Sequence, residues 1–120
     1  MVYAPVVQCE FLIPICRDAE LSDGQAHHPE DWEWLREELF LRFDGATVAP
    51  GFYSEFYRDP DTHQRVDDVS RKYFVAVPEK KLGQLRTLLS EACVPFQQKC
   101  IYLSIAGRVE FVEATPDGSH

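Results

Sequence analysis

The chain has 120 residues, 45% of them hydrophobic, and a formal net charge of −8, a composition that fits one globular domain. The acidic balance disfavours nucleic acid and anionic lipid as partners, because their phosphates would be repelled. No apolar stretch approaches the roughly 20 residues of a membrane helix, and no signal peptide is recognised. We therefore expect a cytoplasmic protein without nucleic-acid or membrane partners.

The first part of the chain predicts one strand and one long helix. Residues 7–15 are apolar and β-branched with an alternating pattern, which is typical of a strand, and a polar loop follows over residues 17–28. A helix begins at Pro29, carries acidic residues in its first turn and ends at Asp44-Gly45. The apolar residues at helical spacing, which should face the sheet, are Trp32, Leu35, Leu39 and Phe43.

The middle of the chain predicts a hairpin. A second strand covers residues 46–57 and bends at Pro50-Gly51, which favours an edge position. Residues 58–67 contain turn-forming Asp and Pro and are expected to form the hairpin loop. The third strand covers residues 69–77.

The last part predicts a second helix and a fourth strand. The helix begins at Pro78 and stops before Pro95. The fourth strand runs from Gln98 to Ile105, and residues 108–113 are a further strand-like piece.

The order of elements is strand, helix, strand, strand, helix, strand. Because crossovers in one sheet are right-handed, this order predicts an α+β fold of the ferredoxin-like split βαβ (βαββαβ) type. The expected sheet has four antiparallel strands in the order 4-1-3-2, with two helices on one face. We expect a single domain over residues 1–114 and a disordered tail over residues 115–120.

The predicted sheet face opposite the helices mixes aromatic, apolar and charged residues, which is typical of a covered face. Its cover could be a second copy of the chain, another protein or a ligand. The candidate ligand or interface residues, including one arginine near the start of the third strand, are Glu10, Leu12, Tyr53, Glu55, Arg71, Lys72, Phe74, Tyr102 and Ser104.

Two interpretations of these candidates stay open. In one, Glu10 or Glu55 acts as a base in a pocket where tyrosine or lysine orients a substrate. In the other, the charges form cross-strand ion pairs, such as Glu10 with Lys72, beside a dimer contact. Arg71 points inward and needs either a carboxylate of the acidic first helix or an acidic ligand.

A metal or redox site is the less favoured reading of the remaining polar residues. The cysteines, Cys9, Cys16, Cys93 and Cys100, include no CxxC pair and are expected to be free structural thiols. Histidines 27, 28 and 63 are expected to be solvated. The acids 59, 61, 67 and 68 lack EF-hand spacing and are expected to be turn residues. No metal and no cofactor is expected.

The middle of the chain resembles a family of small bacterial proteins of unknown function. The resemblance covers Trp32 to Val77 and includes the run Arg42-Phe43-Asp44-Gly45-Ala46-Thr47-Val48, Gly51-Phe52-Tyr53, and Asp68-Val69-Ser70-Arg71. It implies a ferredoxin-like or dimeric α+β-barrel architecture and no particular activity.

No strong catalytic motif is present, so the sequence does not define a function. The favoured hypothesis is a non-catalytic binding or protein-interaction module that forms a homodimer through the exposed sheet face. The alternative is a small metal-independent enzyme of the dimeric α+β-barrel type, acting on a small organic molecule.

Overall fold

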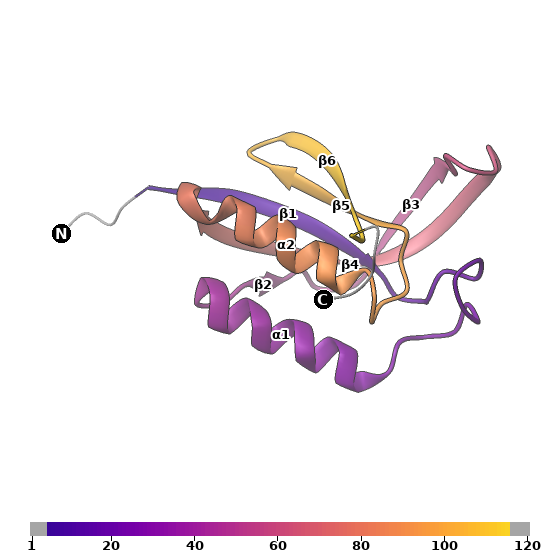
Figure 1. The fold of residues 1–120 in the computed structure, drawn as a ribbon, viewed down its shortest axis with the longest axis horizontal. Helices are drawn as coiled ribbons and strands as arrows, with labels where there is room; N and C mark the ends of the chain where they lie inside the picture. The colour runs from indigo at the N-terminus through magenta and orange to yellow at the C-terminus, as the bar shows by residue number, and fades with distance from the viewer. Residues whose placement is uncertain (1–4, 116–120) are drawn as a thin grey trace.

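The sheet is organised around β4 (Arg65–Pro78), its longest strand. In a computed structural model that describes residues 5–115, β1 (Val6–Pro14) pairs antiparallel with one side of β4, and β5 (Cys100–Ile105) pairs with the other side of β1. β6 (Arg108–Glu113) adds a further strand at that edge. Figure 1 shows this sheet behind the helices.

Two short strands share the other side of β4. β2 (Thr47–Val48) pairs with its second half and β3 (Tyr53–Arg58) with its first half. Between them, Pro50 lacks an N–H donor and Gly51 has a φ of 75°, a conformation that favours glycine. The chain therefore leaves the ladder and re-enters it as a second edge strand.

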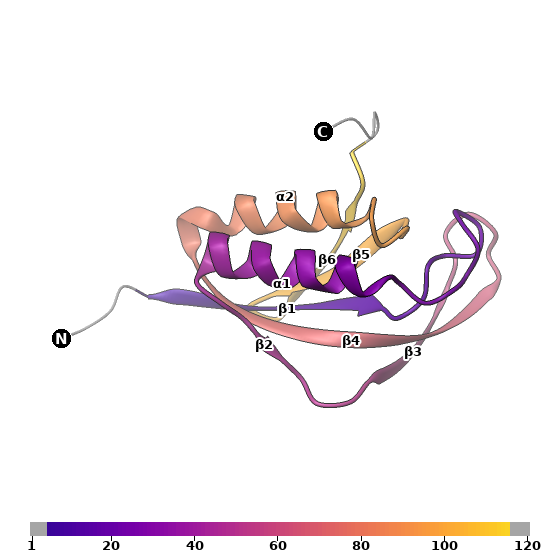
Figure 2. The same ribbon diagram turned by 90° about the horizontal axis from the view of Figure 1, so that it is seen from below.

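Both helices lie on one side of the sheet (Figure 2). α1 (Pro29–Phe43) begins with proline, which is suited to the first helical turn, and ends at Asp44 in the left-handed conformation. A short 3₁₀ turn, η1 (Glu79–Lys81), leads into α2 (Leu82–Ala92). α1 packs over β4, whereas α2 contacts β4, β5 and β6.

The core lies between this helical layer and the sheet. It is made by alternate residues of the strands and by one face of each helix. The large side chains with the least exposure are Phe11, Ile13, Leu35, Leu39, Leu85, Leu88, Leu89, Phe96, Ile101 and Leu103.

The predicted four-stranded ferredoxin-like fold with the order 4-1-3-2 is wrong. The sheet has six strands, in the order β2-β4-β1-β5-β6, and β3 also pairs with β4. One difference is that the predicted strand over residues 46–57 is two strands. The other is that residues 108–113 form a full sheet strand, reached through a two-residue turn in which Ala106 and Gly107 both have positive φ.

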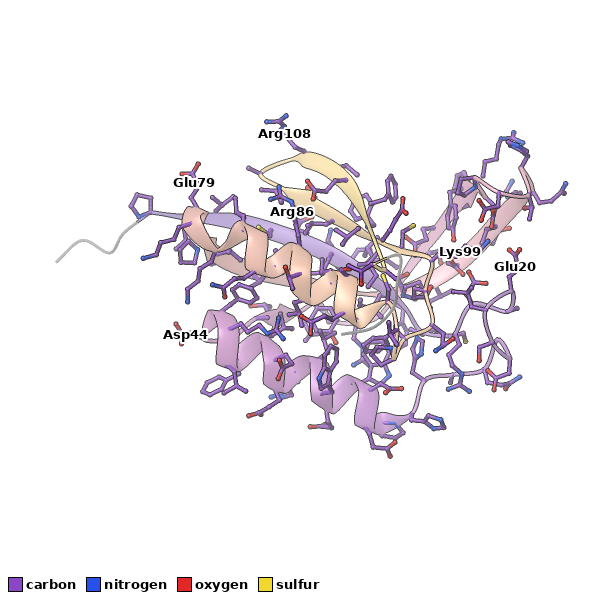
Figure 3. The ribbon with its side chains drawn as sticks, in the orientation of Figure 1. Glu20, Asp44, Glu79, Arg86, Lys99 and Arg108 are labelled. Atoms are coloured by element: carbon purple, nitrogen blue, oxygen red, sulfur yellow. The ribbon has the colours of Figure 1, made fainter. Side chains whose placement is uncertain are left out.

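Three loops meet at the end of the sheet where β5 begins. The Lys99 ammonium lies 3.1 Å from Glu20, 3.2 Å from Asp61 and 3.3 Å from Asp59. Figure 3 shows Lys99 and Glu20 near each other at this end of the sheet. The Gln98 amide donates to the Cys16 carbonyl at 2.9 Å. These contacts tie the β3–β4 hairpin to the loops around residues 16–20 and 97–99.

No helix within residues 5–115 is long and apolar enough to cross a membrane. All four cysteines are free, with Cys9 and Cys93 buried and Cys16 exposed. Of the predicted tail, residues 116–120 lie outside the described part of the chain, and the single domain over residues 1–114 stays a prediction.

Candidate functional site

The sheet face opposite the helices carries three diagonal side-chain contacts between β3 and β4. Tyr53 lies opposite Ser70 and Glu55 opposite Asp68 in the ladder, so their side chains share one face. The Tyr57 hydroxyl donates to Asp68 at 3.0 Å, and the Ser70 hydroxyl donates to Glu55. One step further along, the Lys72 ammonium lies 5.0 Å from the centre of the Tyr53 ring.

Glu55 and Asp68 are half-buried carboxylates without a basic partner in the described part of the chain. Burial raises the pKa of Glu55 and the pKa of Asp68, and the hydrogen bonds from Ser70 and Tyr57 offset this only in part. Neither forms an ion pair with any residue between 5 and 115. Burial and the neighbouring Asp68 carboxylate also raise the pKa of Tyr57. This part of the face therefore holds negative charge that the described chain does not neutralise.

Lys72 lies between this acidic pair, Glu55 and Asp68, and the centre of the sheet. Its ammonium lies 3.3 Å from the Glu10 carboxylate and 5.2 Å from the centre of the Phe74 ring. The sequence left open an ion pair between Glu10 and Lys72, and this pair is formed. At a half-exposed position, the electrostatic attraction of an ion pair is nearly cancelled by the cost of ordering and desolvating the two side chains. The Glu10–Lys72 ion pair is therefore weak evidence for a purely structural role.

The face continues across β1, β5 and β6. Leu12 lies opposite both Lys72 and Tyr102 in its two ladders, and Ser104 lies opposite Glu10. The Tyr102 ring packs edge-on against Phe111 of β6, with ring centres 5.9 Å apart. Eight of the nine candidate residues thus share this face, whereas their role in binding a ligand stays a prediction.

Arg71 is the candidate that lies on the other side. Its guanidinium stacks over the Trp32 ring at 4.2 Å, between the sheet and α1. The predicted ion pair with a carboxylate of the first helix is not formed among residues 5–115. A cation–π contact with the indole takes its place.

Tyr57, Asp68 and Ser70 are not among the nine candidates, although the sequence pattern places Tyr57 beside Tyr53 and Glu55 on the predicted face. The sequence predicts Asp68 as a turn residue, whereas β4 already begins at Arg65 and includes Asp68. The signal that could have found these residues is the alternation of Asp68, Ser70 and Lys72, which places them on one face once the strand is extended backwards.

His27 is the residue for which the prediction of a solvated histidine is wrong. It is buried against Trp32 and Phe96, and its Nε2 donates to the Pro14 carbonyl at 2.7 Å. His28 precedes α1 but makes no side-chain capping hydrogen bond. No group of three or more potential metal ligands is found within residues 5–115.

Two shallow grooves lie elsewhere on the molecule. One of about 550 Å³ lies between α2 and β6 and is lined by Arg86, Ser90 and Val112. The other, of about 490 Å³, lies between the two helices beside Trp34 and Glu91. The second groove holds one half-buried carboxylate, Asp31, without an ion pair to a described residue, whereas the β3–β4 face gathers two and is therefore the better candidate site.

Fold and site together define a small α+β protein with an acidic and aromatic sheet face. Two solved structures share this fold. One is a phage SAM lyase in complex with S-methyl-5'-thioadenosine, 15% identical, with a TM-score of 0.69 over 95% of this chain and 94% of that chain. The other is a phage SAM lyase in the apo state, 14% identical, with a TM-score of 0.63 over 96% and 95% of the two chains.

No protein-family model and no curated protein matches the sequence. The resemblance of residues 32–77 to a bacterial family therefore stays a prediction. The favoured hypothesis of a non-catalytic interaction module is contradicted, because the two solved structures that share the fold over nearly the whole chain are structures of a phage SAM lyase. The comparisons agree better with the alternative, a small enzyme acting on an organic molecule.

Proposed function

We propose that this protein is a small enzyme that binds S-adenosylmethionine on the β3–β4 face and cleaves it as a lyase. The observation that carries the proposal is the pair of half-buried carboxylates, Glu55 and Asp68, that no described basic residue neutralises. S-adenosylmethionine carries a sulfonium and an ammonium group, and partly desolvated carboxylates bind such cations better than water-exposed ones. The shared fold with phage SAM lyases supports the choice of substrate.

The chemistry uses few protein groups. Cleavage breaks the bond between the sulfonium sulfur and the four-carbon amino-acid chain, and the electron pair goes to sulfur, giving neutral methylthioadenosine. No water is added, so the carbon that loses the sulfur must be compensated from within the substrate. Either the neighbouring carbon loses a proton and a double bond forms, or the substrate carboxylate attacks this carbon and a lactone forms. Because the sulfonium is already a good leaving group, the reaction needs no metal.

The residues of the face have separate roles in this proposal. The two carboxylates hold the cationic part of the substrate, and Glu55, whose pKa is raised, is suited to accept a proton. Tyr53 and Tyr57 expose ring surface beside them, on which an adenine ring can stack.

Turnover tests this proposal. Purified protein incubated with S-adenosylmethionine is expected to release methylthioadenosine, measured by chromatography with mass detection. Glu55→Gln and Asp68→Asn are each expected to lower kcat/KM at least tenfold. Asp67→Asn is the matched control, because Asp67 is the adjacent residue on the opposite face of β4, where it pairs with Arg65 at 3.2 Å. Turnover that both site variants leave unchanged would contradict the proposed site.

We also propose that a second copy of the chain covers this face in the cytoplasm. The support is its exposed apolar surface, in which Tyr53, Tyr57 and Phe111 are 40%, 47% and 64% exposed. A covering copy would exclude water from the substrate. Sedimentation at micromolar concentration is expected to show a dimer that Phe111→Glu dissociates, and a monomeric wild-type protein would contradict this part.

A further inference from the structure

Lys72 occupies the centre of a small group of side chains that together surround a positive charge. Its ammonium lies 5.0 Å from the Tyr53 ring centre, 5.2 Å from the Phe74 ring centre and 3.3 Å from Glu10. The three groups come from three neighbouring strands, β3, β4 and β1, so backbone pairing fixes their spacing. We call Tyr53, Phe74 and Glu10 the cation box.

The cation box has the composition of a site for sulfonium or quaternary ammonium ligands. Two aromatic faces attract a cation through their quadrupoles, and both rings lie within the ~6 Å at which this attraction acts. Glu10 supplies the charge that aromatic rings lack. A ligand cation of the same charge could therefore make the contacts that the Lys72 ammonium makes with the cation box.

We propose that Lys72 is a resident cation, and that the sulfonium group of a bound ligand replaces it in the cation box. This inference rests on the proposed function and names the part of the site that holds the sulfonium. The exchange is possible because the Lys72 side chain is partly exposed and has four rotatable methylene groups. Glu10 keeps a cationic partner before and after the exchange.

After the exchange, the Lys72 ammonium is free to bind another part of the ligand. A ligand that combines a sulfonium with an amino-acid carboxylate places an anion close to the box, and the displaced ammonium can pair with it. One residue thus neutralises Glu10 in the free protein and the ligand carboxylate in the complex. Glu55 and Asp68, one and two steps further along the strands, remain available for the ligand ammonium.

The exchange also makes the site bind the substrate more tightly than the product. Cleavage converts the sulfonium into a neutral thioether, which has no charge to hold in the cation box. Lys72 can then return to Glu10 and to the two rings. The box therefore favours the charged substrate over the uncharged product.

The test uses trimethylsulfonium as a probe, because this ion has the charge but neither the carboxylate nor the adenosine. Binding is followed by NMR shifts of the Tyr53 and Phe74 ring protons in the full-length protein. Lys72→Ala, which removes the resident cation, is expected to bind the probe at least tenfold more tightly than wild type. Lys72→Arg keeps a cation in the box and is expected to show no gain.

One further variant and one uncharged probe make the outcome specific. Adding Glu10→Gln to Lys72→Ala is expected to reverse most of the gain, and uncharged tert-butanol is expected to bind all variants equally weakly. Equal trimethylsulfonium affinity of wild type and folded Lys72→Ala, checked by circular dichroism, would overturn the inference. The proposed function is tested by a different measurement, because the release of methylthioadenosine by the wild-type protein does not depend on trimethylsulfonium binding.

Discussion

At the scale of single residues, we expect the acidic pair on the sheet face, Glu55 and Asp68, to lower the stability of the fold. Glu55 and Asp68 have raised pKa values because they are half-buried without a described basic partner. Such groups are typical of sites where ligand binding, rather than folding, selects the residue. The pair is therefore expected to behave differently from Glu10, which has Lys72 as its partner.

Neutral variants of the acidic pair should stabilise the protein. A raised folded-state pKa means that the fold prefers the protonated carboxyl, so the stability penalty is present above the folded-state pKa and disappears as the pH falls below the unfolded-state value of about 4. Glu55→Gln and Asp68→Asn keep the acceptors for Ser70 and Tyr57. Each should raise the melting temperature at pH 7 by roughly 2 °C, and the gain should vanish near pH 4. A loss of stability at pH 7 would contradict this account of the pair.

His27 gives the stability a dependence on pH with the opposite sign. Burial lowers its pKa, and Nδ1 has no hydrogen-bond partner among residues 5–115. The folded state therefore prefers the neutral ring, whereas the unfolded chain takes up a proton near pH 6.5. The stability that His27 contributes is present above that pH and is lost as the pH falls towards the folded-state pKa.

The variant His27→Phe tests this assignment. It keeps the ring contacts with Trp32 and Phe96 but loses the bond to Pro14, which costs about 1 kcal/mol at pH 7. Urea unfolding at pH 7 and pH 5 is expected to show a smaller difference for the variant than for wild type. An unchanged difference would assign the acid sensitivity to other groups.

At the scale of elements, the sequence predicted the two helices and the core strands well. α1 begins at the predicted Pro29 and ends at the predicted Asp44, because proline and a left-handed cap act locally. The break between β2 and β3 and the early start of β4 were not predicted. The break and the early start both depend on which residues of β2 and β3 pair with which residues of β4. The turn residues 59–64 do not determine this register.

Truncating a buried side chain of α2 and an exposed side chain of α1 should have different effects on the free energy of unfolding. Leu88 of α2 is fully buried, whereas Phe40 of α1 is 61% exposed. Leu88→Ala is expected to lower the free energy of unfolding by about 2–5 kcal/mol, because it leaves a cavity in the core. Phe40→Ala is expected to change it by less than about 0.5 kcal/mol. Denaturant unfolding measures both, and a large loss for Phe40→Ala would show that the outer face of α1 is covered.

At the scale of the whole molecule, the sequence predicted a mixed sheet face but not its function. The candidate site is assembled from single side chains on separate strands, such as Glu10, Tyr53 and Lys72, so no contiguous motif marks it. The absence of a motif therefore favoured a non-catalytic module, which the shared fold with an enzyme contradicts. The pairing of Asp68 with Tyr57 became visible only through the register of β3 on β4.

The central claim is that the β3–β4 face binds a cationic adenosine ligand. The most direct measurement is a titration of ¹⁵N-labelled protein with sinefungin, which carries an amine in place of the sulfonium and cannot be cleaved at sulfur. The account predicts that amide shifts concentrate in Tyr53–Arg58 and at Asp68, Ser70 and Lys72, and that Asp68→Asn weakens binding. Shifts confined to the groove between α2 and β6, or no binding at millimolar sinefungin, would contradict it.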